Sequence, residues 1–312
     1  MKRVVSVGPG SSTRDHRYET ELLGQRIVLE KIGTDGDLGR VNALMRELDG
    51  QVDALGLANI DLHLRAGRRK YLVRDAARMI RGVSKTPIVD GGGLKETWER
   101  WLITDYLPNQ RGIAFRGKKV LLVSSVDRYA LAEAFVGAGA DVIFGDFIFA
   151  LGLPIPLRSL TSVRILAALL LPIFTKLPFP YLYPIGKKQE EIVPRHGKYY
   201  AWADVIAGDF HYIRRNMPQD LRGKIICTQT ITPMDVEELK KRGVRLLIAD
   251  FESMGGRSFA TNVFQGAVVA LLGKRPDAIT PQEYMDTLLR AGIKPRIDEL
   301  TPSQSVAVSG PR

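Results

Sequence analysis

An acid, an imidazole and two guanidinium groups follow one another in residues 209–215 (DFHYIRR). The preceding apolar run, 203–208, is typical of a strand, so this segment should lie at the carboxyl end of that strand. There, His211 could move a proton, and Asp209 and Arg214 could bind a polar substrate. The alternative is an N-capped helix with a surface histidine, because adjacent helical positions do not face each other.

The glycine-rich segment 90–98 (DGGGLKETW) carries a second group of reactive side chains. Its glycines let the backbone approach a ligand, and a helix that begins here offers partial positive charge at its N-terminus. Lys95 could act as a cation or proton donor, and Asp90 could bind substrate. A glycine-rich linker into a helix over 98–107 is the alternative interpretation.

The loop 8–14 (GPGSSTR) follows the first expected strand, 2–7. Its free backbone N–H groups, the hydroxyls of Ser11 and Ser12 and the guanidinium of Arg14 are groups that bind anions. The loop is therefore a candidate substrate site, although a turn that simply needs glycine explains the same residues.

Residues 118–146 spell strand, polar turn, Ala-rich helix and strand, which predicts a βαβ unit in a parallel sheet. Ligands of doubly wound folds usually sit at the first strand-to-helix turn. This turn lacks the G-x-G-x-x-G of dinucleotide-binding folds, but Ser124, Ser125 and Arg128 can hydrogen-bond phosphate. Asp146 lies about 20 residues beyond the turn, where a ribose-binding acid is usual, which favours NAD over NADP. A strand-end cap is the alternative role of Asp146.

Two later strands end in similar polar loops. Thr228 follows a short apolar run, and Arg257 and Ser258 lie in the loop 250–262. If all these strands share one parallel sheet, Arg214, Arg257 and Ser258 could approach a common anion at its carboxyl edge. The pattern predicts one ligand crevice, in which Thr228, Arg257 and Ser258 help to bind the cofactor.

The expected fold class is α/β, with two α/β domains. The second is predicted to be a Rossmann-like, doubly wound and mainly parallel sheet with a helical apolar insertion. The expected boundaries are 1–110 for an N-terminal substrate domain, 118–276 for the Rossmann-like domain with its insertion at 147–200, and 277–312 for a C-terminal helix and flexible tail. The polar, glycine-containing stretch 108–119 is the expected break.

Prolines, Arg164 and Lys176 interrupt the apolar segment 160–183, so it is too short to span a membrane. It could cover the sheet, line an apolar substrate pocket or lie on a membrane surface.

The composition favours a folded protein with an anionic small-molecule partner. The 312 residues carry a net charge of +11. No nucleic-acid-binding motif and no metal-ligand spacing of histidines or cysteines occurs in the sequence. The single Cys227 excludes an internal disulfide, and the start has too short an apolar run for a signal peptide. We therefore expect a cytoplasmic protein, and we expect it to form a homo-oligomer.

Three strings, 183–189 (YPIGKKQ), 203–215 (ADVIAGDFHYIRR) and 256–262 (GRSFATN), resemble a bacterial family known as quinate 5-dehydrogenase. The resemblance runs from residue 1 to about 276. It implies NAD(P)-dependent oxidation of a hydroxyl on a cyclic polyol acid, with a substrate domain before a Rossmann domain. Quinate and shikimate dehydrogenases use a Lys and Asp pair in the cleft. The nearest candidates here, Lys95 and Asp35, occur in the reverse chain order.

The preferred hypothesis is an oxidoreductase that uses NAD or NADP, in which Lys95, Asp35 or His211 moves the proton that accompanies hydride transfer. A transferase for a nucleotide-activated or lipid-linked substrate is the second hypothesis. A non-catalytic binder or sensor of an anionic metabolite is the third.

Overall fold

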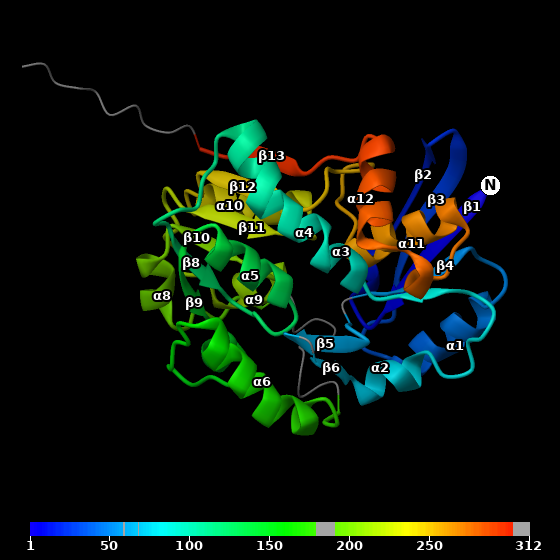
Figure 1. The fold of residues 1–312 in the computed structure, drawn as a ribbon, viewed down its shortest axis with the longest axis horizontal. Helices are drawn as coiled ribbons and strands as arrows, with labels where there is room; N and C mark the ends of the chain where they lie inside the picture. The colour runs from blue at the N-terminus through cyan, green and yellow to red at the C-terminus, as the bar shows by residue number, and fades with distance from the viewer. Residues whose placement is uncertain (59, 68, 179–190, 302–312) are drawn as a thin grey trace, which may run out of the picture.

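The computed structural model describes residues 1–58, 60–67, 69–178 and 191–301, and it shows two α/β lobes side by side (Figure 1). Each lobe is built around one mainly parallel sheet, and a two-stranded hairpin lies near the boundary between the lobes. The predicted α/β class with two sheets is confirmed.

The first part of the chain forms the first sheet and three helices. Its elements are β1 (Lys2–Gly8), η1 (Ser12–Arg14), β2 (His16–Leu22), β3 (Gln25–Gly33), α1 (Leu38–Leu48), β4 (Ala54–Leu57), β5 (His63–Ala66), β6 (Arg69–Leu72), α2 (Arg74–Met79), β7 (Ile88–Val89) and α3 (Gly92–Glu96).

The remainder forms the second sheet, its helices and a return to the first lobe. Its elements are α4 (Trp98–Trp101), η2 (Leu102–Gln110), β8 (Lys119–Leu122), α5 (Tyr129–Gly137), β9 (Asp141–Phe144), η3 (Asp146–Ala150), α6 (Leu160–Phe174), α8 (Gly197–Trp202), β10 (Val205–Ala207), α9 (Phe210–Asn216), β11 (Ile225–Thr228), α10 (Pro233–Lys241), β12 (Leu246–Ala249), α11 (Thr261–Leu272), η5 (Pro276–Ala278), α12 (Pro281–Arg290) and β13 (Arg296–Glu299).

The first sheet has the order β2-β3-β1-β4-β7, in which only β2 runs antiparallel to its neighbour. Side chains alternate along β1, as the period of a strand requires. Val5 and Val7 pack with α1 and α2, whereas Val4 packs with α11 and α12. The sheet is therefore covered by helices on both faces.

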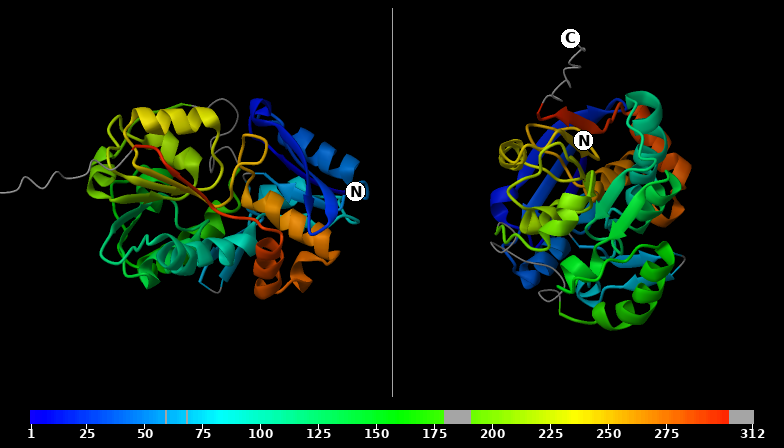
Figure 2. Two further views of the ribbon diagram at one scale, coloured as in Figure 1. Left: turned by 90° about the horizontal axis from the view of Figure 1, so that it is seen from above. Right: turned by 90° about the vertical axis from the view of Figure 1, so that its left-hand side faces the viewer.

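Helix α11 belongs to the first lobe by its packing, although the sequence order places it in the predicted domain 118–276. Val263 and Phe264 share a core with Val4 of β1. Gly266 lets the helix approach the sheet closely, because a Cβ at this position would lie 2.6 Å from a methyl carbon of Val4. Figure 2 shows α11 and α12 in orange beside the blue strands.

The second sheet has the order β13-β12-β11-β10-β8-β9, and only β13 is antiparallel. Its parallel strands follow the 2-1-3-4-5 order of doubly wound folds, whose ligands bind at the switch point between the first and third strands. Here that point lies between β8 and β10. One face carries η2 and α5, and the other carries α8, α9 and α10, which confirms the predicted doubly wound sheet.

Three segments of the chain cross between the lobes. The first crossing lies within and just after α4, since Trp98 packs in the core of the first lobe and Leu102 in that of the second. It therefore comes before the polar stretch 108–119 that the sequence pattern favours. The second crossing runs from β12 to α11, and the third runs from α12 to β13. The strand β13 is an addition to the predicted C-terminal helix and tail.

Helix α6 is the predicted apolar insertion, and it packs against both lobes. Val163 lies in the core of the second lobe, and Ala167 and Leu171 lie in that of the first. Over the described ranges, no helix combines the length and apolarity that crossing a membrane requires. Residues 183–189, which are part of the family resemblance, and the tail 302–312 lie outside the described residues.

Candidate functional site

The carboxyl ends of strands from both sheets meet at the boundary between the lobes, where two hollows adjoin. The inner cavity has a volume of about 50 Å³, and the outer cleft, between the hairpin, α3, α5 and α12, has about 800 Å³. Both hollows are lined by Asp61, Asp90, Lys95 and Asp127. These four side chains therefore form a polar boundary that a ligand can reach from either side.

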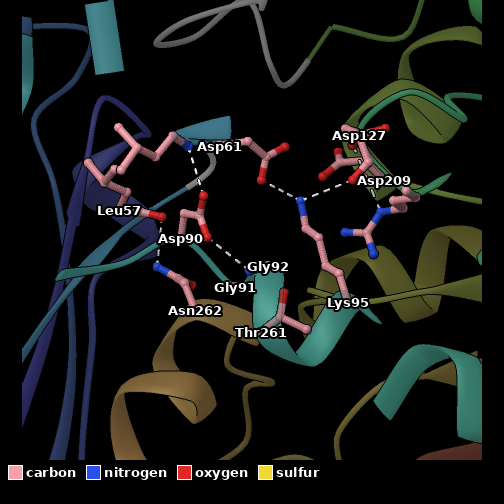
Figure 3. Close-up of polar contacts among 12 residues, drawn as sticks. Leu57, Asp61, Asp90, Gly91, Gly92, Lys95, Asp127, Asp209, Thr261 and Asn262 are labelled. Atoms are coloured by element: carbon pink, nitrogen blue, oxygen red, sulfur yellow. Dashed lines mark hydrogen bonds and ion pairs between the residues drawn. The ribbon is translucent and has the colours of Figure 1, made fainter. Parts of the chain in front are cut away.

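Lys95 and Asp61 form an ion pair at this boundary (Figure 3). Lys95 Nζ lies 2.5 Å from Asp61 Oδ1 and 3.4 Å from the backbone oxygen of Asp127. Only 13% of the Lys95 side chain and 12% of the Asp61 side chain are exposed. Burial and the nearby acids Asp127 and Asp90 raise the pKa of Asp61 to about 7, although Lys95 opposes the shift. Burial alone would lower the pKa of Lys95, but the Asp61 carboxylate outweighs it and the pKa is raised.

Asp90 holds this pair in place. Its Oδ1 accepts a 2.9 Å hydrogen bond from the N–H of Gly92, and its Oδ2 accepts one of 3.0 Å from the N–H of Leu62. The carboxylate thus ties the loop that carries Asp61 to the helix that carries Lys95. Gly91 adopts the left-handed region at φ +92°, which explains why glycine follows Asp90.

Asp209 and His211 also line the inner cavity. Asp209 caps α9 by accepting the backbone N–H of His211 at 2.8 Å, and it accepts a 2.9 Å bond from Gln229 Nε2. Its carboxylate thus bonds to the backbone of His211 and not to the ring. Burial lowers the pKa of His211 to about 4 although Asp209 opposes the shift, so the ring is neutral at pH 7. Its Nδ1 is buried and has no hydrogen-bond partner among the described residues.

The candidate arginines lie beside this part of the cavity. Arg14 Nη2 contacts Asp235 Oδ2 at 3.1 Å, and Arg214 Nε lies 3.7 Å from the other oxygen of the same carboxylate. Arg257 donates to the backbone oxygens of residues 13 and 15 at 3.3 and 3.2 Å. Loop 8–14 and helix α9 thus meet across the boundary between the lobes.

The turn after β8 does not fit the dinucleotide role that the sequence favoured. Both carboxylate oxygens of Asp146 are engaged, by the N–H groups of Ser125 and Val126 at 2.9 and 3.0 Å and by the Ser125 hydroxyl. Asp146 is therefore a loop anchor rather than a free ribose ligand, and Ser125 is fully buried. Ser124 bonds to Asp127.

Arg128 is also unsuited to a phosphate role. Its side chain is 3% exposed and forms an ion pair with the buried Glu99. Burial opposes the charge, but Glu99 and Asp127 outweigh it and raise the pKa of Arg128. Its charge is therefore paired with Glu99, while Nε and Nη2 of the guanidinium are buried without a hydrogen-bond partner among the described residues. We conclude that this turn does not fit the pyrophosphate and ribose of NAD or NADP.

Five other candidates lie away from the lining of the inner cavity and the outer cleft: Ser11, Ser12, Asp35, Thr228 and Ser258. Asp35 accepts the N–H of Ser12 at 2.8 Å, whereas the partner of Lys95 is Asp61. Ser11 accepts the N–H of Thr13, and Thr228 donates to the Gly208 oxygen. The Ser258 hydroxyl is buried without a partner among the described residues. Among the residues that the structure describes, no group of three or more acids, histidines and cysteines could hold a metal ion.

Sequence reasoning missed Asp61, Gln229 and Thr261. Gln229 donates to Asp209, and its Oε1 accepts from Thr261 Oγ1 at 3.2 Å, which connects the lobes. Asp61 and Gln229 lie within a few residues of the ends of β4 and β11, whereas Thr261 begins α11. Strand-end position is thus the signal that could have found the first two.

Two family models match the chain, and both describe domains of unknown function. One, the domain of unknown function DUF8753, matches residues 3–90, and the other, DUF8754, matches residues 93–300. A search of curated proteins finds no match.

Several solved structures are similar to the chain at low identity. Glutamate dehydrogenase from Thermus thermophilus is 15% identical, covers 93% of this chain and 73% of its own, and has a TM-score of 0.42. Malic enzyme from Entamoeba histolytica is 14% identical, and the match covers 93% of this chain and 69% of the malic enzyme chain, with a TM-score of 0.36. A 5-methylthioribose transporter solute-binding protein from Thermotoga lettingae is 10% identical. The match covers 95% of this chain and 85% of the binding protein, with a TM-score of 0.34.

Proposed function

We propose that this chain, which belongs to the family of the domain of unknown function DUF8754, is an acid–base enzyme acting on a small polar molecule between its lobes. The observation that carries the proposal is the Lys95 and Asp61 pair. Nearly nine-tenths of each side chain is buried, and the pair lies where the inner cavity meets the outer cleft.

The two groups suit complementary tasks. A carboxyl with a pKa of about 7 can both take up and release a proton near neutral pH, which is what a general acid or base requires. The Lys95 ammonium can stabilise negative charge that develops on a substrate oxygen, because the surroundings exclude most water. Asp61 is thus assigned proton transfer to or from a hydroxyl, and Lys95 is assigned charge stabilisation.

Oxidation of a hydroxyl on a small polyol acid, with NAD or NADP, is the narrower form of this proposal. A proton acceptor beside a hydroxyl is a requirement of that reaction, and the resemblance to quinate 5-dehydrogenase favours it. Since the turn after β8 does not fit a dinucleotide, the outer cleft is the place to seek cofactor binding. Its 800 Å³ lies in the range of sites for drug-sized ligands.

The first experiment is a thermal-shift screen of the full chain with NAD, NADP, hydroxy acids, a nucleotide sugar and S-adenosylmethionine. Turnover is then measured with each compound that binds. Asp61→Asn and Lys95→Met should each lower turnover by about 100-fold or more, the scale of general acid–base catalysis. The control is Lys118→Met, at an exposed lysine before β8. Turnover that survives both cleft substitutions would overturn the proposal.

A non-catalytic binding protein is the second candidate function. The three crossings between lobes on either side of a polar cavity favour it, because such connections permit hinge closure around a ligand. A compound that binds tightly, is not consumed and loses affinity in Asp61→Asn would support this alternative.

A further inference from the structure

Lys31 is a buried lysine without an acceptor. It lies in β3, in register with Ser6 of β1, and only 8% of the residue is exposed. An ammonium group offers three hydrogen-bond donors. Lys31 Nζ has no hydrogen bond, and no ion pair within 4 Å, to any described residue. A buried charge without a partner is unfavourable in the ligand-free protein, so an anion bound beside Lys31 would stabilise the charge.

The surroundings of Lys31 are rich in other donors. Arg14 and Arg257 add positive charge, and together with burial, the largest cause, they lower the pKa of Lys31 to about 8 although Asp15 and Asp209 oppose them. Arg14 Nη1 is buried and unpartnered among the described residues, although Nη2 of the same group binds Asp235. His211 of the second lobe also has a buried Nδ1 without a hydrogen-bond partner among the described residues, and in the neutral ring one of the two nitrogens is a donor.

Helix α11 adds a third kind of donor. It has 12 residues, and its N-cap is Ala260, which offers no side-chain acceptor to the first turn. Ala260, Thr261 and Asn262 line the inner cavity. A helix N-terminus carries partial positive charge and exposes backbone N–H groups, which is a common arrangement for binding anions.

The acids at this end are already occupied. Asp209 accepts from His211 and Gln229, and Asp235 accepts from Thr232 as well as from Arg14. Asp15 accepts the N–H of Gly33 at 2.6 Å. The first lobe therefore presents donors without acceptors at its boundary with the second lobe, whereas the carboxylates around them are used in local hydrogen bonds.

We propose that the boundary between the lobes at the Asp209 and His211 end of the inner cavity is an oxyanion subsite, formed by Lys31, Arg14 and the N-terminus of α11. The inference rests on the proposed function and deepens it. The substrate carries a carboxylate or phosphate group at this end and an oxygen that undergoes proton transfer at the Lys95 and Asp61 end.

The test is the thermal shift of the full chain titrated with inorganic phosphate, malonate and malate at constant ionic strength. Under the inference, at least one of these ions gives a saturable rise in Tm. Lys31→Met removes an unpaired buried charge, so it should raise the Tm of the ligand-free protein by about 2–5 °C. The same variant should weaken binding of the ion about tenfold or more.

Two control variants separate this inference from the catalytic proposal. Lys118→Met changes an exposed lysine, and Lys95→Met changes the ion pair with Asp61 rather than the proposed anion donors; both should keep the saturable response. The inference is overturned if none of the three ions gives a saturable response, or if Lys31→Met responds as the wild type does. A failed catalytic proposal would instead leave the anion response intact and show no turnover with any compound. Phosphate and carboxylate ions compete for the same donors, and their relative affinities identify which group the substrate carries.

Discussion

Replacing Lys95 with Met removes the ammonium that lies 2.5 Å from Asp61 Oδ1 and keeps a side chain of similar length. Breaking a buried ion pair usually costs about 3–5 kcal/mol, because one charge is left without a partner. Asp61 can avoid most of this cost by taking up a proton. We therefore expect the destabilisation by Lys95→Met to depend strongly on pH.

The sign follows from the pKa of Asp61. Burial raises it from the ordinary 3.8 to about 7 even with Lys95 present, and loss of the ammonium raises it further. Between the unfolded and folded pKa values, the folded state binds more protons than the unfolded state, so stability falls as pH rises. In the wild type this fall ends near pH 7. In Lys95→Met it continues above pH 7, at up to about 1.4 kcal/mol per pH unit.

The assay is urea unfolding of the wild type, Lys95→Met and Lys118→Met at pH 6, 7, 8 and 9. The difference in unfolding free energy between the wild type and Lys95→Met should be smallest at pH 6. It should be larger by about 2–3 kcal/mol at pH 9, while Lys118→Met stays within about 0.5 kcal/mol of the wild type throughout. The double variant Asp61→Asn/Lys95→Met should lose this pH dependence. A penalty for Lys95→Met that is equal at pH 6 and pH 9 would refute the reasoning, because Asp61 would then not be the group that titrates.

Two further predictions concern the loops around the site. Asp146→Ala removes the acceptor of three hydrogen bonds within the turn after β8, so it should destabilise the fold by about 2–4 kcal/mol in urea unfolding. Asp141→Ala, at an exposed carboxylate, is its control, and equal stability of the two variants would contradict the anchoring role. Gly91→Ala places a Cβ 3.1 Å from Asn262 N at a positive φ, so it should cost about 1–3 kcal/mol and weaken ligand binding. Gly112→Ala, with positive φ but open space around it, should cost only about 1 kcal/mol and leave ligand binding unchanged.

Local pattern is sufficient to predict much of the secondary structure. Helix α1 (Leu38–Leu48) is an example, since an Asp N-cap and a helical apolar period act together there. The edge strands β2 and β13 were missed. β13 (Arg296–Glu299) is charged and only partly buried, so it has almost no apolar signal, and β12 beside it supplies its hydrogen bonds.

Tertiary placement is the part that local pattern does not contain. An apolar helix such as α11 signals that it is buried but not which sheet buries it. Lys95 was found because glycines mark its junction, whereas its partner Asp61 lies 34 residues away in a segment without a motif. The Asp146 carboxylate is not free for the expected ribose contact, because the backbone N–H groups of the adjacent turn donate to it.

Helices α11 and α12 come late in the chain but pack in the first lobe, and this order affects folding during synthesis on the ribosome. The first sheet is complete once β7 has emerged, but one of its faces stays uncovered until residues 261–290 have been made. For most of translation, Val4, Ile27 and Leu29 must therefore be shielded by other means, and contacts of such long sequence separation form slowly. For the same reason, the segment 3–90 matched by one family model is a unit of sequence and not a unit that can close its own core.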